Sequence, residues 1–149
     1  MPPTKELVIF THTYDLLSWL LPQCERFPKS QRFVITQRLQ GAALDFQEAI
    51  FEANARSGGQ RLEHLQAADA RLNKLRLYLR LSRQWDWLSS GQYEHVSRMV
   101  AEIGRLLGGW LKQTRSGVPS RAIGGTPGSD AVRLGGQNRS RGSARISGA

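Results

Sequence analysis

The chain has 149 residues, enough for one domain with a core of ordinary size, and 21 Lys and Arg against 12 Asp and Glu give it a net charge of +9. That balance favours a polyanion or an acidic protein surface as a partner. The single cysteine excludes an intramolecular disulfide, and neither a secretory signal nor an apolar run of the roughly 20 residues that span a membrane is present, so we expect a soluble cytoplasmic protein.

The first helical pattern covers residues 6–24. Apolar side chains recur there at steps of three and four, as on one face of an α-helix: Leu7, Phe10, Tyr14, Leu17, Leu21 and Cys24. Pro22 is expected to end or kink this helix, because proline lacks the backbone donor and clashes with the preceding turn. The link at residues 27–30 follows, with Ser30 as the expected N-cap of the next helix.

A second helix is predicted from about residue 31 to residue 56. Its apolar seam has the same rhythm and consists of Ile35, Leu39, Ala42, Phe46, Ala49 and Ala53. An acidic stripe of Asp45, Glu48 and Glu52 runs beside that seam. Gly58 and Gly59 are expected to terminate the helix, because glycine adopts the left-handed C-cap conformation without steric cost.

The third helix combines a broad apolar face with a stripe of arginines. Its seam consists of Leu65, Ala68, Leu72, Leu75, Leu79 and Ser82. Leu77 and Leu81 widen this face, so we expect contacts with neighbours on two flanks. Arg76, Arg80 and Arg83 follow the same spacing on the opposite side.

A fourth helix follows the turn at residues 89–91. Its seam consists of Tyr93, Val96, Val100, Ile103, Leu107 and Trp110. Four helices of about 20–28 residues with short links predict an all-α fold, an antiparallel up-down four-helix bundle, over residues 1–115. Residues 116–149 hold eight of the 15 glycines, with five Arg and one Asp, and we expect this C-terminal tail to be disordered and basic.

The sequence contains no signature of catalysis or of a cofactor. It has no Gly-rich phosphate loop and no dinucleotide-binding motif. A di-metal bundle needs Glu-x-x-His, but the residue three before each histidine is Ile9, Arg61 or Gln92. Cys24 lies on an apolar seam and is expected to be a core thiol. We therefore expect no enzyme activity, no cofactor and no metal.

The basic residues carry the functional signal and fall into two groups. Arg76, Arg80 and Arg83 either pair with the acidic stripe of the second helix or face a ligand, and the sequence leaves both interpretations open. The second group lies along the last helix, with only Glu94 and Glu102 to balance it, and supplies the expected phosphate contacts: Arg98, Arg105, Lys112 and Arg115. Phosphate contacts do not read bases, so we expect RNA or DNA to bind without sequence preference.

Three glycines interrupt the last helix, at Gly104, Gly108 and Gly109. Each costs up to about 1 kcal/mol relative to alanine inside a helix. Two of them are four residues apart and would let another backbone approach closely, whereas the alternative is a fraying helix end. Because Trp110 and Leu111 beyond them are apolar, a packing contact, for example between protomers, is favoured.

Several blocks of the chain resemble one family over about residues 6–115. They are Phe27-Pro-Lys-Ser-Gln-Arg-Phe33, the Leu- and Arg-rich run at 69–81, Gln92-Tyr-Glu-His95 and Glu102-Ile-Gly-Arg-Leu-Leu-Gly-Gly-Trp-Leu-Lys112. The family is that of four-helix bundles which includes proteins encoded in intervening sequences of 23S ribosomal RNA genes and the accessory variability determinant (Avd) of diversity-generating retroelements. The long helices with Trp85, Trp87 and Trp110 look more like the retroelement branch.

The resemblance implies a non-enzymatic accessory protein that forms a homopentameric ring with a basic surface. Such a protein associates with the retroelement's reverse transcriptase and with template RNA or cDNA, and supports mutagenic reverse transcription. The alternative is a 23S rRNA intervening-sequence-type protein that acts as a structural oligomer or an rRNA-associated factor. A neighbouring reverse-transcriptase gene would select the first, and a location inside a ribosomal RNA gene would select the second.

Overall fold

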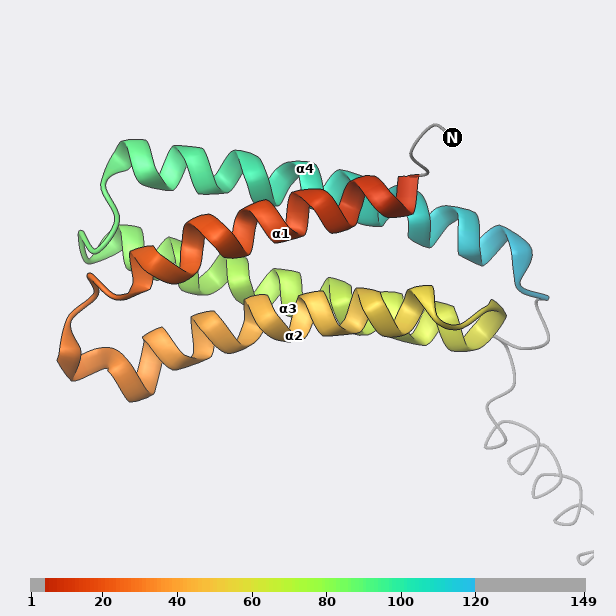
Figure 1. The fold of residues 1–149 in the computed structure, drawn as a ribbon, viewed down its shortest axis with the longest axis horizontal. Coiled ribbons are helices and arrows are strands. Elements are labelled where there is room, and N and C mark those ends of the chain that lie inside the picture. Colours follow the sequence, from red (N-terminus) through yellow and green to blue (C-terminus); the bar gives the residue numbers. More distant parts are fainter. Residues whose placement is uncertain (1–4, 120–149) are drawn as a thin grey trace, which may run out of the picture. The chain divides into compact units, whose positions relative to one another are not determined.

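The computed structural model describes residues 5–119, with side chains from Val8 onward, and its elements are helical throughout that range. Four long helices follow in order (Figure 1): α1 (Lys5–Cys24), α2 (Gln37–Asn54), α3 (Gly58–Gln84) and α4 (Ser90–Gly117). A 3-10 turn, η1 (Lys29–Gln31), and one turn of π-helix, η2 (Arg32–Thr36), join α1 to α2. The predicted all-α class is confirmed.

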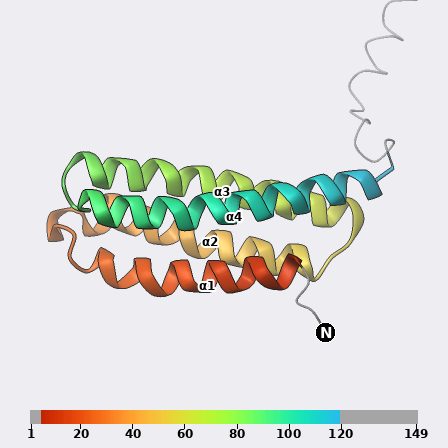
Figure 2. The ribbon, with the colours of Figure 1, turned by 90° about the horizontal axis from the view of Figure 1, so that it is seen from above.

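The four helices lie side by side and alternate in direction along the chain (Figures 1 and 2). Helix α2 packs on α3, α3 on α4, α4 on α1 and α1 on α2, which closes the bundle around one core. This is the up-down four-helix bundle that the short links predicted. None of the described helices is long and apolar enough to cross a membrane. The pentameric ring stays a prediction.

The seams of α3 and α4 lie in the core where the sequence places them. All six predicted seam residues of α3, from Leu65 to Ser82, are buried. In α4, the five predicted seam residues from Val96 to Trp110 are buried, and the sixth, Tyr93, is half-buried at the edge of the core. Ser82 is tolerated inside because its hydroxyl donates a hydrogen bond of 2.7 Å to the carbonyl oxygen of Tyr78.

The predicted seam of α1 is wrong by one position along most of the helix. The core contains Ile9, Thr13, Leu16, Leu20 and Cys24, whereas Tyr14 is 68% exposed. A polar Thr13 made the true seam look interrupted in the sequence. Its hydroxyl donates to the carbonyl oxygen of Ile9 at 2.7 Å, so no buried polar group is left unpaired there. Cys24 belongs to both seams and is buried, as predicted.

The links also differ from expectation. Ser30 is not an N-cap: it lies inside η1, and α2 begins seven residues later at Gln37. Helix α2 ends at Asn54, and the predicted turn glycine Gly58, with φ +60°, is the first residue of α3. Pro22 lies two residues before the end of α1, close to the predicted stop.

The last helix extends beyond the boundary predicted at Arg115. It runs to Gly117, and Val118 after it is only 7% exposed. Trp110 and Leu111 are buried in the core, so this end of α4 is packed rather than frayed. The rest of the predicted tail, residues 120–149, lies outside the described residues.

Candidate nucleic-acid interface

The arginine stripe of α3 does not pair with the acidic stripe of α2 inside the protomer. Asp45 lies 3.7 Å from Arg71, and Glu52 lies 3.0 Å from Arg56, one turn further along the chain. None of the ion pairs among the described residues joins Arg76 or Arg80 to an acid. The intramolecular form of the ion-pair interpretation is therefore wrong, and these two charges are available to a ligand.

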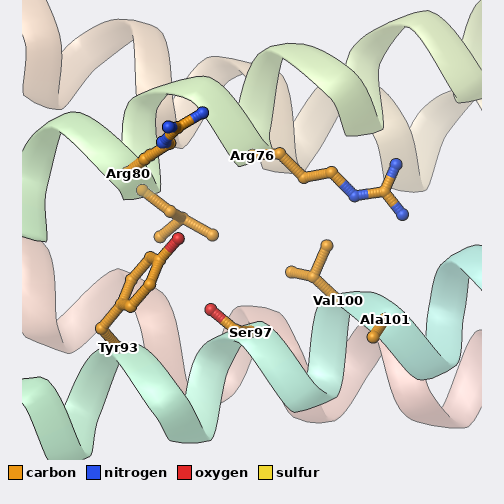
Figure 3. Close-up of a pocket in the computed structure, with 7 residues that line it drawn as sticks. Arg76, Arg80, Tyr93, Ser97, Val100 and Ala101 are labelled. Carbon is orange, nitrogen blue, oxygen red and sulfur yellow. The ribbon is translucent and has the colours of Figure 1, made fainter.

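Arg76 and Arg80 line an open hollow between α3 and α4, with a volume of about 260 Å³ (Figure 3). Tyr93 and Ser97 border it from α4, one helical turn apart, and both hydroxyls point into the gap in Figure 3. Leu79, Val100 and Ala101 complete the lining. The described residues of this hollow include no carboxylate, so the hollow is positively charged and bordered by hydroxyl groups.

Gly104 makes room for one of the two guanidinium groups. A Cβ atom at this position would collide with Nη2 of Arg76, while the Gly108 and Gly109 positions have no neighbour within 4 Å. Nη1 of the same guanidinium donates a hydrogen bond of 2.9 Å to Oδ1 of Asn73. The sequence predicted a close backbone approach at these glycines. Inside the protomer the close approach is that of an arginine side chain, at one glycine only.

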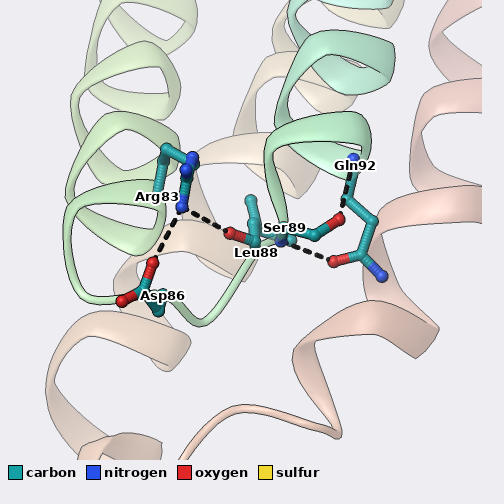
Figure 4. Close-up of polar contacts among 5 residues, drawn as sticks. All are labelled: Arg83, Asp86, Leu88, Ser89 and Gln92. Atoms are coloured by element: carbon teal, nitrogen blue, oxygen red, sulfur yellow. Dashed lines mark hydrogen bonds and ion pairs between the residues drawn. The ribbon is translucent and has the colours of Figure 1, made fainter.

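Arg83 has a structural role at the turn between α3 and α4. Its Nη1 donates to Oδ1 of Asp86 at 2.9 Å and to the carbonyl oxygen of Leu88 at 3.4 Å (Figure 4). In the same turn Ser89 forms a capping box: its Oγ accepts from the Gln92 backbone N–H, and its own N–H donates to Gln92 Oε1. Arg83 is therefore held by protein groups that Arg76 and Arg80 lack.

The four cationic residues of α4 divide into two pairs. Arg98 pairs with Glu94, and Arg105 pairs with Glu102 at 2.6 Å. The hydrogen bond and charge of Arg105 lower the pKa of Glu102, and the same contact raises the pKa of Arg105. Lys112 and Arg115 are exposed and belong to none of the ion pairs found between residues 5 and 119.

The seven predicted contacts do not form one patch. Lys112 follows Gly104, against which the Arg76 guanidinium rests, by eight residues, which is about 12 Å along a helix. Among the seven, the charges without an acidic partner therefore fall into two groups, Arg76 with Arg80 beside α4 and Lys112 with Arg115 near its end. Sequence analysis missed the contribution of Ser97 and assigned Tyr93 to the core. The spacing of Tyr93, Ser97 and Gly104 along one side of α4 is the signal that marks them.

Cys24 offers no reactive thiol. The side chain is 3% exposed, and burial raises its pKa to about 12. The thiolate is the nucleophilic form, so this cysteine is inert at neutral pH, as predicted for a core residue. No cluster of three His, Cys, Asp or Glu side chains suited to a metal ion occurs among the described residues.

Fold and charge define the class first: a basic four-helix-bundle protein. A model of the bAvd-like family matches residues 7–114, nearly all of the described bundle, and the chain belongs to this family. A protein of unknown function from the S23 ribosomal protein family of Bacteroides thetaiotaomicron has a similar fold, with a TM-score of 0.67 and 19% identity over 73% of this chain and 99% of that one. No curated protein matches. The resemblance drawn from the sequence blocks is thus confirmed.

Proposed function

We propose that this protein is a non-enzymatic accessory subunit of a diversity-generating retroelement, which binds the element's reverse transcriptase and its template RNA or cDNA in the cytoplasm. The observation that carries the proposal is the bAvd-like match over residues 7–114. It reaches into all four helices, so nearly the whole described fold, and not a fragment of it, is the part shared with the family.

The charge distribution supports the nucleic-acid part of the proposal. Residues 1–115 contain 16 Lys and Arg against 11 Asp and Glu, so the bundle is basic without its tail. Among the predicted contacts, Arg76 and Arg80 of α3 and Lys112 and Arg115 of α4 belong to none of the ion pairs between described residues. Arginine and lysine side chains that have no acidic partner can bind the phosphate groups of RNA or DNA.

The exposed apolar residues support assembly into a ring. Leu77 on α3 is 52% exposed, and Leu44 and Phe51 on α2 are also exposed. Assembly into a ring would remove such side chains from water, as at surfaces that another chain covers. In a homopentamer, symmetry would repeat each cationic patch five times and produce a basic belt. Light scattering should then give five times the protomer mass of 16.7 kDa.

Co-purification with the reverse transcriptase of the proposed retroelement tests the function directly. We expect a stable complex, and we expect the free protein to bind two unrelated RNA or DNA sequences equally well. If about four to six phosphates are neutralised, log affinity should fall with log salt at a slope near −4 to −5. A clear preference for 23S ribosomal RNA, with no complex with the transcriptase, would instead support the rRNA-associated alternative.

A further inference from the structure

The hollow between α3 and α4 is lined by hydrogen-bond donors that suit an anion, and its described lining residues include no carboxylate to neutralise them. The side chain of Arg80 makes no hydrogen bond or ion pair with the described residues, and the guanidinium of Arg76 donates only to the neutral Asn73. A guanidinium presents its N–H groups as a planar fork that matches two oxygens of a phosphate. The hydroxyls of Tyr93 and Ser97 can donate to the same kind of oxygen.

The spacing of these groups suits a chain of phosphates better than a single anion. Arg76 and Arg80 are one turn apart on α3, about 6 Å along the axis, which is similar to the separation of successive phosphates in an extended strand. Tyr93 and Ser97 have the same spacing on the facing helix, which runs in the opposite direction. A strand lying along the groove would therefore meet donors from both helices, with the Arg76 guanidinium at the Gly104 end.

The groove also has a defined end. A neighbouring hollow shares Arg80 and Tyr93 but includes Asp86, whose carboxylate is paired with Arg83. Arg83 lines that hollow too, but Asp86 already neutralises it, so the two guanidinium groups without an acidic partner lie along the stretch from Arg80 toward Arg76. Gly104 lies at the far end and leaves the space in which the Arg76 guanidinium rests against α4.

We propose that the α3–α4 groove, with Arg76, Arg80, Tyr93 and Ser97 as donors, is a binding site for the phosphodiester backbone of a nucleic-acid strand. This inference rests on the proposed function and specifies where the strand lies on each protomer. The contacts are to phosphates and not to base edges, so the site does not select a sequence. Gly104 is a positioning residue in it, because it acts on the ligand only through Arg76.

The test compares Arg80→Ala with Arg98→Ala in the full chain. Both changes remove one exposed positive charge, but Arg98 lies outside the groove and is paired with Glu94. Binding of labelled single strands of two unrelated sequences is measured by fluorescence anisotropy between about 50 and 200 mM salt. We expect Arg80→Ala to weaken both strands about tenfold and to lower the salt slope by about one, and Arg98→Ala to change affinity much less.

Two further variants make the result specific. Ser97→Ala removes a groove hydroxyl without changing charge and should weaken binding by a smaller factor, about twofold to fivefold. Arg80→Lys restores the charge but not the fork, so it should recover the salt slope more than the affinity. Melting curves followed by circular dichroism check that each variant is folded as well as the parent.

The outcomes separate this site from the proposed function. Equal losses in Arg80→Ala and Arg98→Ala would mean that only net charge matters, and would overturn the groove while nucleic-acid binding stands. Loss of the transcriptase complex in Arg80→Ala, with unchanged strand binding, would overturn it in favour of a protein contact. If the parent chain binds neither strand nor transcriptase, the proposed function itself fails, before any variant is measured.

Discussion

Replacing Gly104 with alanine should stabilise the bundle and yet weaken nucleic-acid binding. Inside a helix, alanine is favoured over glycine by up to about 1 kcal/mol. The new methyl group would meet Leu72 Cδ2 at an ordinary 3.7 Å, and its one severe clash is with the end of the Arg76 side chain. A flexible side chain can move aside, so the cost is the exposed hydrogen bond from Arg76 to Asn73, about 0.5–1 kcal/mol.

Gly108→Ala is the matched control, because it makes the same chemical change one turn along α4 where no atom lies within 4 Å. We expect Gly108→Ala to gain close to the full 1 kcal/mol, or about 4 °C in melting temperature, and Gly104→Ala to gain between zero and about half of that value. Urea and thermal unfolding followed by circular dichroism measure both. In the anisotropy assay, only Gly104→Ala should lose affinity, since it displaces a groove arginine without altering net charge.

Two results would refute this reasoning. A loss of more than about 1 kcal/mol in Gly104→Ala would mean that backbone, and not a mobile guanidinium, occupies the space beside this glycine. Equal strand affinity in the two variants would mean that the position of Arg76 is irrelevant to binding. Light scattering on both proteins is part of the experiment, because a change of mass in Gly108→Ala alone would place Gly108 in a contact between protomers.

Three further predictions concern the core and its ends. Leu72→Ala should lower the free energy of unfolding by about 2–5 kcal/mol in urea titrations, because the side chain is fully buried. Cys24 should resist thiol reagents in the native state. Because folding raises the pKa of its thiol to about 12, its contribution to stability should be complete below the unfolded thiol pKa and lost as pH rises from there toward about 12. Truncation after Arg115 should cost about 1.5 kcal/mol more than removal of residues 120–149, because only the former deletes the buried Val118.

The buried face of a helix was most predictable where leucine dominates it. Leucine recurs through α3 with little interruption, so its buried face could be assigned residue by residue. In α1 the core accepts Thr13, whose hydroxyl bonds to its own helix, and an apolar Tyr14 lies beside it in solvent. Apolar periodicity therefore chose the neighbouring face in α1, whereas in α3 the preceding leucines assign the buried face before the polar Ser82 is reached.

The candidate site was predictable in its charges but not in its partners. The spacing of Arg76 and Arg80 was visible, yet whether they face acids or a ligand depends on how α3 is rotated against α2 and α4. In the structure α2 offers Asp45 to Arg71 instead, and the arginine pair lies beside α4. The role of Gly104 depends on the path of one side chain across a helix interface, which no pattern within α4 encodes.

The π-helical turn before α2 sets the helical phase of the residues immediately before it. Continued backward as an α-helix, α2 would direct Arg32 inward, four residues before the buried Thr36. The extra residue of η2 gives the inner position to the partly buried Gln31 and keeps Arg32 exposed, with Phe33 80% exposed beside it. A one-residue deletion within η2 would leave Gln31 four residues before the buried Thr36, so a regular α-helical turn would then keep Arg32 in solvent, and the bundle should tolerate this deletion far better than a one-residue deletion in the middle of α2.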